Sequence, residues 1–185
     1  FMYKCALKYL LFCLFFVGTS KLNATHIVGG EMTYQRTGTN TYKIRLDLYI
    51  DCLNGNSQAI ASDATAIFGI FNGNTKKILS GYPISVSRKG PLRVQKTNYN
   101  CIAVAPNACV DHYWYETNVT LPPTLDGYYV SFQRCCRNGT ISNIVNPGFA
   151  GANYWAFIPD SRLFGKENSS AVFNELPPNF LCTNT

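Results

Sequence analysis

The sequence predicts an all-β protein, built as a disulfide-linked antiparallel β-sandwich of the immunoglobulin-like or jelly-roll type. Three observations support this fold class. Short segments rich in aromatic and β-branched residues alternate between apolar and polar positions, and Gly, Asn and Pro separate them. No segment shows the periodicity of an amphipathic helix of convincing length. Six cysteines follow an N-terminal secretion signal, namely Cys52, Cys101, Cys109, Cys135, Cys136 and Cys182.

Residues 1–24 have the features of a signal peptide. Lys4 and Lys8 form a basic start, the apolar run from Leu10 to Val17 follows, and cleavage is expected after Ala24. The run is shorter than the roughly 20 residues that a membrane-spanning helix needs. We therefore expect export to the cell surface or beyond, with no stable membrane insertion once the signal is removed. An oxidising compartment in turn predicts that the remaining cysteines form disulfides.

The expected β-domain covers residues 25–165. Its clearest strand is Thr41 to Cys52, where apolar and polar side chains alternate over a dozen positions. One face carries Tyr42, Ile44, Leu46, Leu48, Ile50 and Cys52, and the other carries Lys43, Arg45, Asp47, Tyr49 and Asp51. This period of two is typical of a half-buried antiparallel strand.

Four further segments follow the same rule. Strands are expected over Ala64 to Phe71, His112 to Leu121, Gly127 to Cys136 and Tyr154 to Ile158. In the third of these, Tyr128, Val130, Phe132 and Arg134 share one face. Residues 166–185 change in texture and are expected to form a linker and the start of a following β module, which would make the chain a fragment of a longer protein.

The pairing of the cysteines is only partly constrained by the sequence. Cys135 and Cys136 are adjacent, and neighbouring side chains of a strand point to opposite faces, so we expect each to reach a different element. Cys101 and Cys109 bracket a Pro-Asn turn and are candidates for closing a small loop, which leaves Cys52 and Cys182 for the adjacent pair. Fifteen connectivities remain open. Structural zinc sites use paired C-x2-4-C spacings, which this chain lacks.

Few residues carry catalytic chemistry. Ile27 to Glu31 (IVGGE) copies the activated N-terminus of chymotrypsin-like proteases, but the other protease motifs are absent. The alternative is a first strand in which Gly29 and Gly30 allow close packing or a bulge. His112 is expected to be structural, because it lies on an aromatic strand. The sequence therefore predicts no enzyme, no catalytic or metal site and no cofactor, although carboxylates of a glycoside hydrolase that converge only in the fold stay open.

Charge and aromatic content bear on the partners. Half of the net charge of +6 leaves with Lys4, Lys8 and Lys21, and the remainder forms no basic run, so nucleic acid binding is not expected. The chain has 12 Tyr, 12 Phe and 2 Trp, enough to supply both a core and a sugar-stacking surface. Core packing is the more common use of such residues. The candidates for glycan contact are Tyr113, Trp114, Tyr115, Tyr154 and Trp155.

Several segments together resemble the N-terminal region of large secreted proteins from Bacteroidetes-type bacteria, often labelled PKD-domain or gliding-motility-associated proteins. They include ATHIVGGEMTY (residues 24–34), LDLYIDC (46–52), LPPTLDGYYVSFQRCCRN (121–138) and NSSAVFNELPPNFLC (168–182), and QRCCRN is the most specific of them. Cys109-Val110-Asp111 belongs to the same set, whereas Ile50 stands where that family commonly has Arg. The resemblance implies an exported surface protein with further immunoglobulin-like modules and a type IX sorting domain, and it supplies no catalytic residues.

The function expected from these features is that of a non-catalytic N-terminal module of a secreted or cell-surface multi-domain protein. Such a module would serve adhesion or surface display, with a link to gliding motility implied by the resemblance. The expected partners are the following domains of the same polypeptide, surface polysaccharide and other surface proteins. The alternative is a dedicated carbohydrate-binding module that uses exposed aromatic residues.

Overall fold

The computed structural model describes residues 26–94, 109–160 and 168–171, and it is an all-β fold. Seven antiparallel strands form one hydrogen-bonded sheet in the order β1-β2-β5-β4-β3-β6-β7. Their bounds are β1 Ile27–Gly38, β2 Thr41–Asp51, β3 Thr65–Asn72, β4 Ile84–Arg93, β5 Val110–Thr120, β6 Tyr128–Arg134 and β7 Ala152–Ile158. A six-residue helix, α2 (Ser57–Ser62), and a short 3-10 turn, η1 (Pro147–Phe149), complete the described elements.

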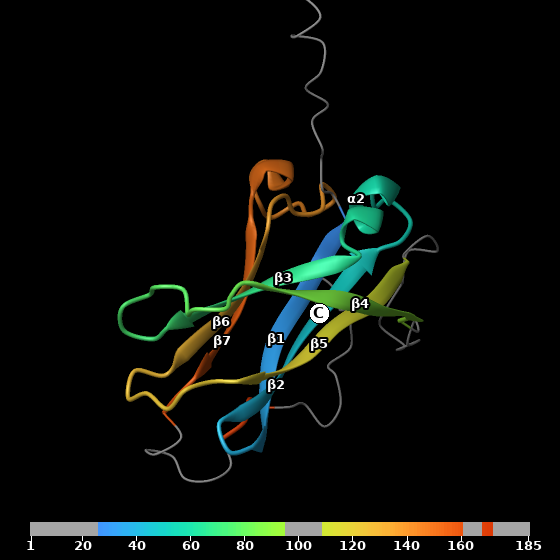
Figure 1. Ribbon diagram of the computed structural model, residues 1–185. Helices are drawn as coiled ribbons and strands as arrows, with labels where there is room; N and C mark the ends of the chain where they lie inside the picture. The colour runs from blue at the N-terminus through green and yellow to red at the C-terminus, as the bar shows by residue number, and fades with distance from the viewer. Residues whose placement is uncertain (1–25, 95–108, 161–167, 172–185) are drawn as a thin grey trace, which may run out of the picture.

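The sheet folds over on itself, so that its two edge strands nearly meet. Figure 1 shows β3 and β4 crossing over β1, β2 and β5, while β6 and β7 return toward β1. The two strands approach closely at Gly30 of β1, where an added Cβ atom would lie 3.0 Å from Cε1 of Tyr154 in β7 and 2.6 Å from the carbonyl oxygen of Asp47. The sequence-based expectation of close packing at this glycine, with a register shift beside it between Ile27 and Gly29, is confirmed.

The core fills the space that the folded sheet encloses. Tyr42, Ile44, Leu46, Leu48 and Ile50 of β2 are all buried, as their alternation predicts. They pack with apolar side chains from the opposite part of the sheet, including Phe68, Ile70, Val130, Phe132 and Ile158. The all-β class and antiparallel pairing are confirmed, whereas the immunoglobulin-like or jelly-roll sandwich stays a prediction.

One disulfide joins the end of β2 to the start of β5. Cys52 is bonded to Cys109, with their Cα atoms 5.3 Å apart and a sequence separation of 57. Asp51 and Val110 are directly paired across these two strands, so the bond closes the end of a ladder that already exists. The expected loop between Cys101 and Cys109 is therefore wrong, and Cys101 and Cys182 lie outside the described residues.

The second disulfide joins the adjacent residues Cys135 and Cys136. The expectation that these neighbours point to opposite faces and each reach a different element is wrong, because β6 ends at Arg134 and the two cysteines do not belong to a strand. Cys136 has a φ of 78°, which is the left-handed region, and this turn brings both sulfur atoms to the same side. Just beyond it, buried Asn138 donates to Asp51 Oδ2 at 2.9 Å and ties the loop to the end of β2.

A cluster formed by the buried residues His26 and Asp63 and the partly exposed Arg134 ties three further segments together. The Asp63 carboxylate lies 2.6 Å from Nε2 of His26 and 2.7 Å from a guanidinium nitrogen of Arg134. Its main-chain carbonyl accepts the hydroxyl of Tyr115 at 2.6 Å. The residue before β1, the turn after α2, the middle of β5 and the end of β6 therefore share one acidic residue.

The outer edge of β1 is covered by residues 168–171. Ser170 donates its N–H to the carbonyl of Tyr34 at 2.8 Å, and its hydroxyl accepts the Tyr34 N–H at 2.9 Å. The hydroxyl of Ser169 accepts the N–H of Arg36 at 3.1 Å. Backbone groups of the edge strand that would otherwise face solvent are thus partly satisfied. The remainder of the predicted linker and the signal region lie outside the described residues.

Candidate functional site

A shallow groove crosses the outer face of β3, β6 and β7. Its volume is about 400 Å³. We call it the aromatic groove, and it is lined by Phe71, Lys76, Tyr129, Ser131, Gln133, Asn153 and Trp155.

Strand alternation explains why these side chains gather on one face. Tyr128, Val130 and Phe132 of β6 point into the core, so Tyr129, Ser131 and Gln133 between them point outward. In the antiparallel register, Ser131 pairs with Trp155 and Gln133 pairs with Asn153. The outward residues of β6 and β7 therefore stand side by side across the ladder.

Three aromatic rings form the apolar part of this face. The ring centroid of Tyr129 lies 5.5 Å from that of Trp155 and 4.8 Å from that of Phe157, at tilted angles. Trp155 is 56% exposed and Phe157 38% exposed, so the rings present uncovered surface to solvent. Lys76 lies over the Tyr129 ring, with Nζ 3.9 Å from its centroid.

Polar groups stand directly beside the rings. The hydroxyl of Ser131 donates to Oδ1 of Asn153 at 2.8 Å, which orients that amide and leaves its nitrogen for another acceptor. Gln133 and Asn153 are both exposed. Aromatic surface next to amide donors and acceptors is the combination that a sugar ring requires, because a sugar has apolar C–H faces and a rim of hydroxyls.

The aromatic residues that the sequence indicated for glycan contact do not form one patch. Tyr115 is 1% exposed and lies in the core, which corrects its placement among the ligand-contacting candidates. Tyr113 and Tyr154 are half-buried and pack against the core from β5 and β7. Trp114 lies on the outer face of β5, but Arg45 covers its ring at 5.4 Å and His112 adjoins it at 5.6 Å. Trp155 alone among the five lines the groove.

The other groove residues were missed by sequence reasoning. A signal for part of them was present, because assigning Tyr128, Val130 and Phe132 to one face of β6 places Tyr129, Ser131 and Gln133 on the other. Phe71 and Lys76 come from the end of β3 and the turn after it, and only the fold brings them to the same surface.

The outer face of β2 and β5 carries a charged network instead. Asp47 accepts a bidentate pair of hydrogen bonds from Arg45, the shorter ones at 2.8 Å, and lies 2.6 Å from Nε2 of His112. Glu116 pairs with Lys89 at 2.7 Å and with Arg45 at 3.4 Å. Burial raises the pKa of Asp47, but the hydrogen bonds from His112 and Arg45 outweigh it and hold the pKa below 3.8. The hydrogen bond from Lys89 likewise lowers the pKa of Glu116.

This network predicts a loss of stability in acid. Because the pKa of Asp47 is lower in the folded chain than its ordinary 3.8, its contribution is fully present above that pH. It disappears as the pH falls through the folded pKa, since protonation breaks the pairs with Arg45 and His112. We expect the midpoint of thermal unfolding, followed by circular dichroism from pH 7 to 2, to decline below about pH 4. Asp47→Asn should be less stable at neutral pH and show a shallower decline, and an equally steep decline in that variant would contradict this origin.

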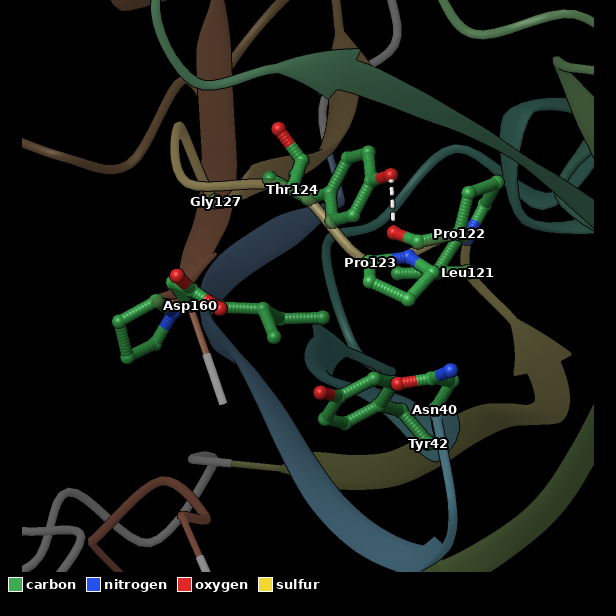
Figure 2. A pocket seen from close by; sticks show the side chains of 11 residues that line it. Asn40, Tyr42, Leu121, Pro122, Pro123, Thr124, Gly127 and Asp160 are labelled. Carbon is green, nitrogen blue, oxygen red and sulfur yellow. Dashed lines mark hydrogen bonds between the residues drawn. The ribbon is translucent and has the colours of Figure 1, made fainter. Parts of the chain in front are cut away.

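A second hollow lies where the turn before β6 meets the start of β2. Figure 2 shows Pro122, Pro123 and Tyr42 around it, with the hydrogen bond from the hydroxyl of Tyr128 to the carbonyl of Pro122 at 2.6 Å. Its volume is about 10 Å³, which is near the lower limit for holding one water molecule. This hollow is too small for a ligand, so the aromatic groove is the better candidate site.

Within residues 26–94, 109–160 and 168–171, no three His, Cys, Asp or Glu side chains gather closely enough to hold a metal ion. Over the same residues, no helix has the length and apolar character to span a membrane. No family model, curated protein or solved structure matches this chain.

Proposed function

We propose that this chain is a non-catalytic binding module of a secreted or cell-surface protein, and that it holds polysaccharide in the aromatic groove. The single observation that carries the proposal is the exposed ring of Trp155, flanked by Tyr129 on one side and by the amides of Gln133 and Asn153 on the other. Such a module serves adhesion. The resemblance to the N-terminal regions of Bacteroidetes-type surface proteins supports the same role, within a larger polypeptide that is itself linked to gliding motility.

The lowered pKa values and the ion pairs of Asp47 and Glu116 support a binding role over hydrolysis. A glycosidase general acid needs a raised pKa, so that it carries a proton near neutral pH. Asp47 and Glu116 share the outer face of β2 and β5, but both have lowered pKa values and both are held by cations. The aromatic groove itself is lined by no Asp or Glu.

The Cys52–Cys109 bond suits the proposed location. A disulfide that joins two strands persists in an oxidising environment outside the cell. We further propose that the folded-over sheet corresponds to the β-sandwich class inferred from the sequence, and that the following domains of the polypeptide and surface polysaccharide are its partners.

Removal of the Trp155 ring tests the proposal. We expect Trp155→Ala to weaken binding to polysaccharide by at least about tenfold, because a truncated central aromatic residue typically costs 2 kcal/mol or more. The unfolding midpoint should change little, since the side chain is 56% exposed. Binding is measured by pull-down on a panel of insoluble polysaccharides and by affinity electrophoresis with soluble ones.

The matched control is Phe149→Ala. Phe149 is 76% exposed and lies in η1, so the variant removes an exposed aromatic ring that does not line the aromatic groove. It should bind as the unmodified chain does. Failure of the unmodified chain to bind any polysaccharide, or equal binding by Trp155→Ala, would rule the proposal out.

A further inference from the structure

The aromatic groove does not end at Gln133 and Asn153. These two residues also line a second hollow of about 350 Å³, together with Arg134, Cys135, Gly151 and Ala152. We call the two hollows together the trough. It follows β6 from Tyr129 to Arg134, where five steps of extended chain cover about 17 Å, and it continues to Cys135 just beyond the strand. A surface of this length accommodates a linear chain of several sugar units rather than a single ring.

The trough has positive charge in and beside its lining but no negative charge. Neither hollow is lined by an Asp or Glu. Lys76 stands at one end, over the Tyr129 ring, and its ammonium group donates to the carbonyl of Gly73. Arg137 lines neither hollow, but it adjoins the other end, because its Nε donates to the carbonyl of Gly151, which lines the second hollow, at 3.2 Å.

These two cations differ from those on the outer face of β2 and β4. Arg45, Lys89 and Arg93 are each held by a carboxylate. Lys76 and Arg137 contact main-chain carbonyls and, for Lys76, an aromatic ring, and neither forms an ion pair within the part of the chain that the structure describes. The positive charge of Lys76 is therefore available to a ligand in the aromatic groove, and that of Arg137 to a ligand that extends past Gly151.

Hydrogen bonds fix the main chain from which both cationic side chains extend. Lys76 closes a turn in which its N–H donates to the carbonyl of Asn72 at 3.0 Å, while Oδ1 of Asn72 accepts the N–H groups of Asn74 and Thr75. The N–H of Arg137 donates to the carbonyls of Pro147 and Ala150, both at 3.0 Å. Positions fixed in this way lose less freedom when a ligand binds.

We propose that the trough binds a linear anionic glycan, whose sugar rings stack on Trp155 and whose acid groups meet Lys76 and Arg137. This inference rests on the proposed polysaccharide binding and adds the charge and the length of the ligand. Carboxylate and sulfate groups share the required chemistry, and both fit a surface without acidic lining that has Lys76 at one end and Arg137 beside the other.

The test compares polymers of one backbone with the charge present or removed. The probes are polygalacturonate against its fully methyl-esterified form, for carboxylates, and heparin against its desulfated form, for sulfates. We expect at least one charged polymer to bind tenfold or more tightly than its uncharged counterpart. Affinity for the charged polymer should fall as NaCl is raised from 50 to 500 mM, because screening weakens exposed charge pairs. Longer oligomers of the preferred polymer should bind more tightly than its disaccharide.

The double variant Lys76→Gln/Arg137→Gln should lose this preference and keep the binding of the uncharged polymer. Its matched control is Lys77→Gln, which removes an exposed neighbouring lysine that does not line the trough. Lys77→Gln should keep the preference, and an equal loss in both variants would overturn the inference in favour of diffuse attraction.

The outcomes distinguish a failure of the anionic-ligand inference from a failure of the proposed polysaccharide binding. Equal affinity for charged and uncharged polymers, with binding lost in Trp155→Ala, overturns the anionic ligand and leaves polysaccharide binding intact. Binding that is unaffected by Trp155→Ala overturns the proposed function. Failure to bind any member of either pair overturns the anionic ligand outright, and the neutral polysaccharides of the wider panel then decide the proposed function.

Discussion

Replacing Cys52 and Cys109 together by alanine is expected to lower the free energy of unfolding by about 4 kcal/mol. The bond spans 57 residues, and in the chain-entropy account a cross-link stabilises by restricting the unfolded chain in proportion to the logarithm of that span. Urea unfolding followed by tryptophan fluorescence measures the effect. The slope of the transition should increase as well, because an unfolded chain without this bond exposes more surface.

The second disulfide provides the control. Cys135 and Cys136 are adjacent, so their bond restricts the unfolded chain very little, and Cys135→Ala/Cys136→Ala should lose less than about 1 kcal/mol. Equal losses in the two double variants would contradict the entropic account. A loss below 1 kcal/mol for Cys52→Ala/Cys109→Ala would mean that the β2–β5 ladder holds its end without the cross-link.

Asp63→Ala is expected to be similarly damaging, at about 3–5 kcal/mol. The carboxylate is almost fully buried and pairs with His26, which is completely buried, and with Arg134. Removing it leaves Nε2 of the buried His26 without its partner, whereas Arg134 is 30% exposed and keeps its hydrogen bond to Ser62. The loss of a buried partner costs far more than the loss of an exposed one. Chemical unfolding at pH 7 measures the change.

Lys89→Ala is the matched control for this variant. Lys89 also forms a short ion pair, to Glu116 at 2.7 Å, but its side chain is 51% exposed. Its removal should cost at most about 1 kcal/mol. If Asp63→Ala were as mild as Lys89→Ala, the His26–Asp63–Arg134 cluster would not be holding the three segments together.

The elements with strict alternation were predictable from sequence. In β2, five apolar side chains at every second position face the core, and the strand begins at Thr41 and ends at Asp51, within one residue of the prediction. The expected strands near β3, β5, β6 and β7 are also confirmed, with ends that differ by one or two residues. A single buried face imposes this pattern, so the sequence records it directly.

Strand β4 and helix α2 were missed for identifiable reasons. In β4, Arg88, Lys89, Gly90 and Pro91 interrupt any alternation, and the ladder accommodates them by a register shift between Lys89 and Leu92. Proline inside an apparent strand normally argues against one. Helix α2 has six residues and one buried side chain, Ala59, which is too little to give a helical period.

Pairings between distant segments were beyond sequence reasoning. The Cys52–Cys109 bond depends on β2 and β5 being neighbours. The order of strands in a sheet does not affect the alternation of apolar and polar residues within each strand. The same holds for the aromatic groove. Trp155 was a candidate from composition, but its neighbourhood with Phe71, Lys76 and Tyr129 exists only because β3, β6 and β7 lie together.

The docking of residues 168–171 on the edge of β1 has a mechanical consequence. If the module serves adhesion as proposed, traction on the polypeptide beyond Ala171 would reach the contacts of Ser169 and Ser170 with Tyr34 and Arg36 before it reaches β7. These few hydrogen bonds would break first, before the sheet and the trough on β6 and β7 are deformed. The proposed binding of an external polysaccharide would thereby persist while the pulling force is small.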